Sequence, residues 1–180
     1  LHAKLKRANS EFKDLNKTPI SLDLPSGGLA SFVVLADKLT TFQRHSLLCK
    51  ATELLREEEP TDLGICLFGD DATRKANACA AFYVATVNAA NLPNRKKEHK
   101  FKALKTISIY GFKAEHDYTY VNARVAGNTL CRQLTMTPPN ELTPTLYRQK
   151  IKALATEYDW SHHEFDMPTL KQMGAGAFYA

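Results

Sequence analysis

The sequence lacks the cysteine and histidine patterns that mark metal or redox sites. It holds four cysteines in 180 residues, Cys49, Cys66, Cys79 and Cys131, and none of them forms a C-x-x-C pair. No histidine cluster lies at zinc-ligand spacing from a cysteine. Each cysteine sits inside an apolar run, so we expect buried, reduced thiols in a cytoplasmic protein.

Long apolar runs are also absent. No segment approaches the ~18 apolar residues that suggest a membrane-spanning helix. The first residues, LHAKLKRANSEFKDL, are polar and charged, unlike a secretory signal. The chain opens on Leu1 instead of Met, which favours a trimmed or partial chain. We therefore expect no membrane segment and a cytoplasmic location.

The excess of positive charge is small. There are 24 Lys and Arg residues against 19 Asp and Glu, a net charge of +5, which permits weak attraction to nucleic acid without arguing for it. The basic residues concentrate in segment 94–102, NRKKEHKFK, a predicted loop whose candidate phosphate contacts are Arg95, Lys96, Lys97, Lys100 and Lys102. Phe101 alone could stack on a base. A solvated loop is the alternative interpretation.

The first half of the chain alternates between strand and helix patterns. Ile20, Leu22 and Leu24 alternate with polar residues before the turn sequence PSGG, which predicts a β-hairpin with its second strand near Ala30–Val34. A helix is predicted over 40–58 with one apolar face, ended by Pro60. The apolar run 63–68 is typical of a strand buried on both faces.

The second half continues this alternation. Asp70 or Asp71 can cap a buried helix from about 72 to 90, and segment 105–112 predicts another strand. A helix over about 117–135 carries a predicted packing stripe of Ala123, Ala126, Gly127, Leu130 and Leu134. The order of elements predicts an α/β fold, with a mostly parallel sheet sandwiched by helices and an N-terminal hairpin.

Three prolines in seven residues then form a predicted corner. Pro138 and Pro139 stop the preceding helix because each lacks an amide hydrogen and crowds the turn before it. Thr143 is a suitable N-cap, and Pro144 suits the first position of a new helix over 144–158. That helix places its apolar side chains on one face, namely Leu146, Tyr147, Ile151, Leu154 and Ala155.

This corner carries a resemblance. The stretch ARVAGNTLCRQLTMTPPNELTPTLYRQKIKALA, with LKQMGAGAFYA following it, resembles the leucyl aminopeptidase (cytosol aminopeptidase) family. Members carry an Asn-Thr-Pro-Pro-Asn-x-x-Thr-Pro stretch after the helix that links their two domains. The matching positions here are Thr137, Pro138, Pro139, Asn140, Thr143 and Pro144, and Met136 replaces the first Asn. Residues 173–178, MGAGAF, resemble a later Gly-Met-Gly-x-Phe pattern of the family.

The resemblance implies three parts. Residues 1–116 would form the N-terminal α/β domain, residues 117–136 the linker helix, and residues 137–180 an incomplete start of the catalytic domain. Over residues 1–116 the resemblance rests on the order of elements alone. The later segment should expose apolar faces that a catalytic sheet would cover.

The resemblance also implies a chemistry that this chain lacks. The family hydrolyses the first peptide bond with two divalent metals, manganese or zinc, which activate a bridging water. Its ligands lie in an Asn-Thr-Asp-Ala-Glu-Gly-Arg type stretch and in a Lys- and Asp-bearing segment, and neither occurs here. We therefore predict no catalytic, metal or substrate-binding residue, and no activity, in these 180 residues. The parent protein would be a hexameric enzyme acting on peptides.

A second hypothesis comes from a different class. The chain could be an α/β module that binds nucleic acid, DNA in particular, or a nucleotide-like ligand through loop 94–102. Two further motifs are weaker. His162-His163-Glu164 invites a metal, but a predicted strand over 160–165 would point the two histidines to opposite faces. The segment Gly69-Asp70-Asp71 lies where phosphate loops lie, but its carboxylates would repel a phosphate.

Overall fold

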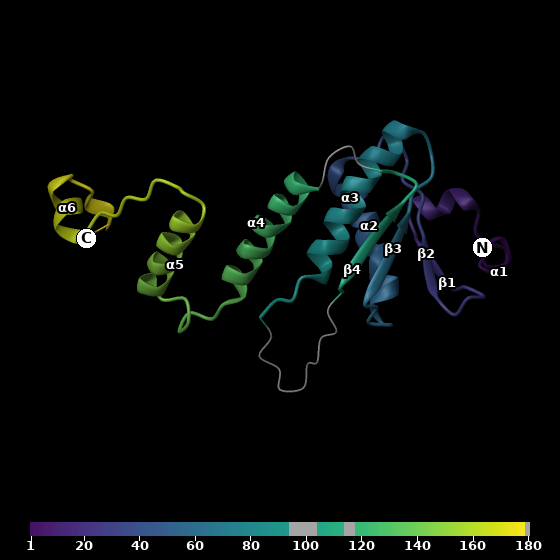
Figure 1. The fold of residues 1–180 in the computed structure, drawn as a ribbon, viewed down its shortest axis with the longest axis horizontal. Helices are drawn as coiled ribbons and strands as arrows, with labels where there is room; N and C mark the ends of the chain where they lie inside the picture. Colours follow the sequence, from purple (N-terminus) through teal and green to yellow (C-terminus); the bar gives the residue numbers. More distant parts are fainter. Residues whose placement is uncertain (94–103, 114–117, 179–180) are drawn as a thin grey trace. The chain divides into compact units, whose positions relative to one another are not determined.

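The structure is a computed structural model that describes residues 1–93, 104–113 and 118–178 (Figure 1). It divides into two compact units, unit 1 over Leu1–Met136 and unit 2 over Thr137–Ala180, and each is described by itself. Unit 1 is a mixed α/β body, and the helices and strands confirm the predicted class. The predicted division into three parts stays a prediction. The residues of the predicted linker helix, 117–136, belong to unit 1.

The N-terminal hairpin is confirmed. After α1 (His2–Arg7) and the short helix η1 (Phe12–Asn16), strand β1 (Ile20–Asp23) pairs antiparallel with β2 (Leu29–Phe32), with Ile20 opposite Phe32. Gly27 lies in the turn with φ of +85°, a conformation that glycine adopts without steric cost. Leu15, from η1, is the most completely buried large side chain.

Strands β3 (Asp62–Cys66) and β4 (Thr106–Tyr110) form the parallel pair, joined through helix α3 (Asp71–Ala89). The prediction that β3 is buried on both faces is wrong. Ile65 packs on the core from α2 and α3, but Asp62, Gly64 and Cys66 on the opposite face are exposed. Within the described residues, the helices α2 and α3 supply the core on one face only, so the strand alternates between half-buried and exposed positions.

The core of unit 1 lies between α3 and α2 (Thr41–Arg56), which pack against each other. Leu48 of α2 packs with Ala80, Ala81 and Val84 of α3. Alanines on α3 allow α2 and the strands to approach closely, because they present no side chain beyond Cβ. Thr40 caps α2 and Asp70 caps α3, as the sequence predicts for the second helix.

Helix α4 (Thr119–Met136) packs on α3 with a different face from the predicted one. Its buried residues are Val121 and Val125, whereas Ala123, Ala126 and Gly127 are exposed. The predicted stripe is therefore wrong for its three small residues, whereas its other members, Leu130 and Leu134, are half-buried. Two valines bury more apolar surface than alanine and glycine, so they decide which face turns inward.

Unit 2 contains α5 (Pro144–Glu157), α6 (Met167–Gln172) and the short helix η2 (Gly176–Phe178). No strand is present in its described residues, so the strand predicted at 160–165 is wrong. A strand needs a hydrogen-bonded neighbour, and the amide of Trp160 instead donates to the carbonyl of Ala155 at 2.8 Å. Gly174, just after the C-cap of α6, has φ of +69°, a left-handed conformation common where helices end.

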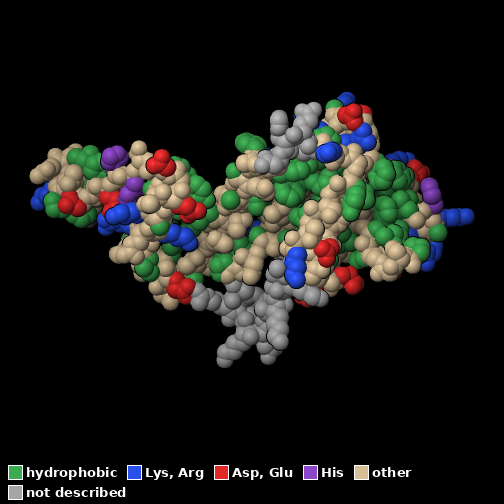
Figure 2. Space-filling model, viewed as in Figure 1, with side chains coloured by type: hydrophobic (Ala, Val, Ile, Leu, Met, Phe, Trp, Pro, Cys, Tyr) green, Lys and Arg blue, Asp and Glu red, His purple; other side chains and the backbone are tan. Residues whose placement is uncertain are grey.

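The apolar residues of unit 2 are mostly at its surface. Ala155 is its one buried hydrophobic residue among those described. Figure 2 shows hydrophobic side chains at the surface of this unit among its charged ones. Leu146, Tyr147 and Ile151, on the face predicted to point inward, remain 39–44% exposed. This agrees with the expectation of an uncovered apolar face.

The cysteines are all free, and none of the four is fully buried. Cys66 and Cys131 are exposed, and Cys49 and Cys79 are half-buried. The expectation of buried thiols is therefore wrong, most clearly for Cys66 and Cys131, because β3 and α4 each turn one face away from the core. No helix in the described ranges is long and apolar enough to cross a membrane.

Candidate functional site

The proline corner has the predicted local geometry. After α4 ends, the carbonyl of Pro138 accepts from the amides of Glu141 at 2.9 Å and Leu142 at 3.0 Å, which closes the turn. The Thr143 hydroxyl then accepts from the Leu146 amide at 3.3 Å, with Pro144 at the first helical position. The sequence of stop, turn and restart is therefore confirmed.

The histidine pair in unit 2 does not converge on one point. His162 Nε2 lies 3.5 Å from Glu164 Oε1, and Glu164 is paired with Arg148. The hydrogen bond from Arg148 lowers the pKa of the Glu164 carboxyl. His163 is exposed. In the part of the chain that the structure describes, no three His, Cys, Asp or Glu residues are grouped to hold a metal.

The predicted nucleic-acid contacts Arg95, Lys96, Lys97, Lys100 and Lys102 lie outside the described residues, because the structure describes none of positions 94–103. Their role stays a prediction.

The acidic pair at the start of α3 is a helix cap. Asp70 Oδ1 accepts from the Thr73 amide at 2.8 Å, and this bond lowers the pKa of the Asp70 carboxyl. Asp71 pairs with Arg74. Both carboxylates are therefore engaged in stabilising the helix, and the first-turn amide of Thr73 is already occupied.

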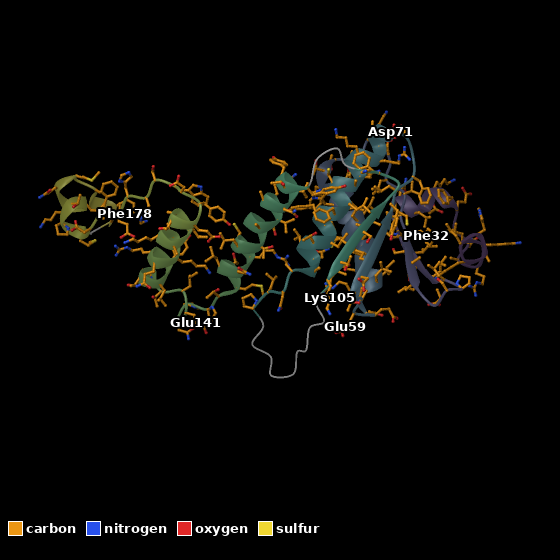
Figure 3. The ribbon with its side chains drawn as sticks, viewed as in Figure 1. Phe32, Glu59, Asp71, Lys105, Glu141 and Phe178 are labelled. Atoms are coloured by element: carbon orange, nitrogen blue, oxygen red, sulfur yellow. The ribbon has the colours of Figure 1, made fainter. Side chains whose placement is uncertain are left out.

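Two hollows lie at opposite ends of unit 1, marked in Figure 3 by Asp71 at one end and by Glu59 and Lys105 at the other. The first, about 960 Å³, lies beyond the carboxyl end of β4. Its lining includes the aromatic and basic side chains Arg74, Lys75, Tyr110, Phe112, Lys113, Tyr118 and Tyr120. The second, about 180 Å³, is lined mainly by apolar residues, including Leu55, Leu63, Ala85 and Leu104.

A third hollow, of about 230 Å³, lies among α2, α3 and α4 and collects cationic groups. We call its members Arg44, His45 and Arg124 the cationic cluster. Arg44 Nη1 donates to Oδ1 of the buried Asn77 at 2.9 Å. The guanidinium of Arg124 lies over the rings of Tyr83, at 5.2 Å, and Tyr120, at 5.9 Å.

His45 connects these groups. Its ring lies 5.2 Å from that of Tyr83. Burial, then Arg124, then Arg44 lower the pKa of His45 below its ordinary value. The imidazole therefore favours its neutral form at neutral pH, since a third positive charge here would be repelled.

Sequence reasoning missed the cationic cluster. His45 stands alone in the sequence, and Arg124 is 80 residues further along the chain than Arg44. The sequence placed Arg44 and His45 together near the start of a predicted helix, which was the one local sign of a basic site. It did not indicate that Arg124 of α4 would line the same hollow.

The described elements define a class of protein: an α/β unit with a parallel β-α-β connection and a hairpin, followed in the chain by a helical unit that begins at a proline corner. No protein-family model matches the chain. Curated relatives do match. Leucine aminopeptidase A2, chloroplastic, of Solanum lycopersicum is 25% identical over the whole chain, which covers 34% of the relative. A probable cytosol aminopeptidase of Nostoc punctiforme is 23% identical over 78% of the chain, or 29% of the relative.

Solved structures agree on the fold. A tomato leucine aminopeptidase mutant superposes with a TM-score of 0.75 at 19% identity, over 97% of this chain and 38% of that one. The bottromycin maturation enzyme BotP, in complex with Mn, gives 0.66 at 14% identity, over 94% and 37%. The curated homologues of this chain are thus leucine and cytosol aminopeptidases, which confirms the resemblance read from the proline corner. The chain spans about a third of their length and corresponds to the N-terminal third.

Proposed function

We propose that the chain is the N-terminal, non-catalytic portion of a metal-dependent leucyl aminopeptidase that removes N-terminal amino acids from peptides. The main support is that the whole chain aligns with only 34% of the length of a leucine aminopeptidase. The proline corner supports it, because its turn and its helix cap occur at the positions that resemble the family stretch. The comparisons favour this function over the nucleic-acid alternative.

The family implies two divalent metals, manganese or zinc, and a neighbouring structure is described as a complex with Mn. The described residues of this chain do not fit such a pair, because they bring no three ligands together. When bound, the metals would polarise the scissile carbonyl and activate water. We propose that other parts of the parent protein hold them, and that this chain supplies none of their ligands.

Unit 2 would contribute the first helices of the catalytic body. The apolar side chains on α5 are 39–44% exposed, which suits a surface that further chain covers. Unit 1 would act in assembly and in shaping access to the active centre. A hexameric parent in the cytoplasm, with peptides as substrates, completes the proposal; one relative is named chloroplastic and another cytosolic.

The test has two arms. The purified 180-residue chain, supplied with Mn²⁺ or Zn²⁺, should give no turnover of leucine p-nitroanilide above the buffer control. The parent reading frame should continue into a Lys- and Asp-bearing segment and then an Asn-Thr-Asp-Ala-Glu-Gly-Arg type stretch. Turnover by the chain alone would disprove the non-catalytic assignment, and a frame without these segments would disprove the peptidase parent.

A further inference from the structure

The cationic cluster has an unusual charge balance for a half-buried hollow. Two guanidinium groups and an imidazole share its lining with Thr41, Tyr83 and small or apolar residues, and the lining contains no carboxylate. Among the residues that the structure describes, neither Arg44 nor Arg124 makes an ion pair with Asp or Glu. Elsewhere in the same residues, Arg74 and Arg148 each pair with a carboxylate.

The cluster is also held in place before any ligand arrives. Asn77, only 8% exposed, accepts from Arg44 and so fixes one guanidinium from α3. The guanidinium of Arg124 lies over the rings of Tyr83 and Tyr120, which hold it by cation–π contacts. Thr41 lies in the first turn of α2, where the helix dipole favours negative charge. Basic groups from α2 and α4 thus meet in one hollow, and α3 supplies the neutral side chains that hold them.

We propose that this hollow is a binding site for an oxyanion of the phosphate class, independent of the aminopeptidase function proposed above. An anion would offset the repulsion between the two guanidinium groups. The planar N–H forks of arginine match phosphate oxygens, and the hydroxyls of Thr41 and Tyr83 can donate to the remaining oxygens. The anion would raise the pKa of His45, because its negative charge opposes the effect of Arg124 and Arg44.

The size of the hollow favours a compact ligand. About 230 Å³ accommodates a tetrahedral oxyanion with a small substituent. Donors that come from α2, α3 and α4 surround the hollow on several sides, which suits a group with three or four oxygens better than a planar carboxylate. The phosphate could be the free ion or part of a small phosphate ester.

The experiment is a titration of the 180-residue chain with inorganic phosphate at constant ionic strength, followed by calorimetry and by the side-chain NMR signals of His45. Saturable binding is expected, and the pKa of His45 should rise towards its ordinary value when phosphate is bound. The groups that face His45 and enter this titration are Arg44 on α2, Cys79 and Tyr83 on α3, and Arg124 on α4.

The variants separate this site from general charge attraction. Arg124→Gln removes an exposed cation and should weaken phosphate binding by about tenfold or more, with an unchanged circular dichroism spectrum. Arg148→Gln, which removes the same charge in unit 2, is the matched control and should leave the affinity unchanged. Equal losses in the two variants, or no saturation up to about 10 mM phosphate, would overturn the proposal.

Two further ligands identify the chemistry. Acetate should compete weakly; competition as strong as that of phosphate would refute the phosphate class. Glycerol 3-phosphate distinguishes the source of the anion. Tighter binding than phosphate supports a small organic phosphate as the ligand, and equal or weaker binding supports the free ion.

Discussion

At the residue scale, two glycines differ in whether the structure has room for a Cβ atom. Gly111 follows β4 with φ of +88°, and a Cβ there would overlap the carbonyl oxygen of Leu67. Gly127 lies on the exposed side of α4, and a Cβ there would meet nothing within 4 Å. The sequence predicted a packing stripe that includes Gly127. The structure places a close backbone approach at Gly111 instead. No local pattern predicted this approach, because Leu67 lies 44 positions earlier in the chain.

The two sites predict opposite outcomes for the same substitution. Gly111→Ala should destabilise unit 1 by about 2–4 kcal/mol, because it combines a positive φ with a clash against backbone. Gly127→Ala should stabilise unit 1 by about 0.5–1 kcal/mol, since glycine in a helix interior loses more backbone entropy on folding than alanine does. Urea denaturation followed by circular dichroism measures both.

Gly27→Ala serves as the control, because Gly27 has φ of +85° but open space around the added methyl group. It should cost roughly 1–2 kcal/mol, the left-handed penalty without the clash. A Gly111→Ala variant no less stable than Gly27→Ala would show that the contact with Leu67 relaxes freely.

At the scale of helices and strands, the turns and caps were predictable from the sequence, whereas the buried face of each element was not. The hairpin turn, the caps at Asp70 and Thr143 and the stop at Pro138 were predictable because each depends on residues within a few positions. The buried face of α4 was not, since it depends on which of its residues meets α3. The strand predicted at 160–165 failed for a related reason, because a strand depends on a partner and none is present in the described part of unit 2.

The cap of α2 gives a test at this scale. Thr40 Oγ1 accepts from the Gln43 amide at 3.3 Å, and Gln43 Oε1 accepts from the Thr40 amide at 3.0 Å, a reciprocal capping box. Thr40→Ala should lower the free energy of unfolding of unit 1 by about 1 kcal/mol. Thr40→Ser keeps the hydroxyl and should stay within about 0.5 kcal/mol of the original chain. Equal losses in the two variants would mean that the methyl group, and not the cap, carries the effect.

At the scale of the whole molecule, the two units differ in what holds them together. Unit 1 contains every buried hydrophobic residue of the described chain except Ala155. Its core cluster and the partly buried residues packed against it, from Val33 to Val84, all come from unit 1 itself. Unit 2 has helices with well-formed caps at Thr143 and Asp166 but little apolar burial to stabilise them. Ordering its backbone costs about 1–2 kcal/mol per residue, which capping alone does not offset.

This difference predicts that the chain can be divided after Met136. Residues 1–136 alone should unfold cooperatively in urea, with a free energy within about 1 kcal/mol of that of the 180-residue chain, because the buried side chains are retained. Residues 137–180 alone should show no cooperative transition, since amphipathic helices of 14 residues or fewer are marginal without a surface to pack on. Intrinsic tryptophan fluorescence follows unit 2 separately, because Trp160 is the only tryptophan in the chain. A cooperative transition of residues 137–180 that matches unit 1 in stability would show that unit 2 has a sufficient core of its own, and would remove the reason to expect that further chain covers α5.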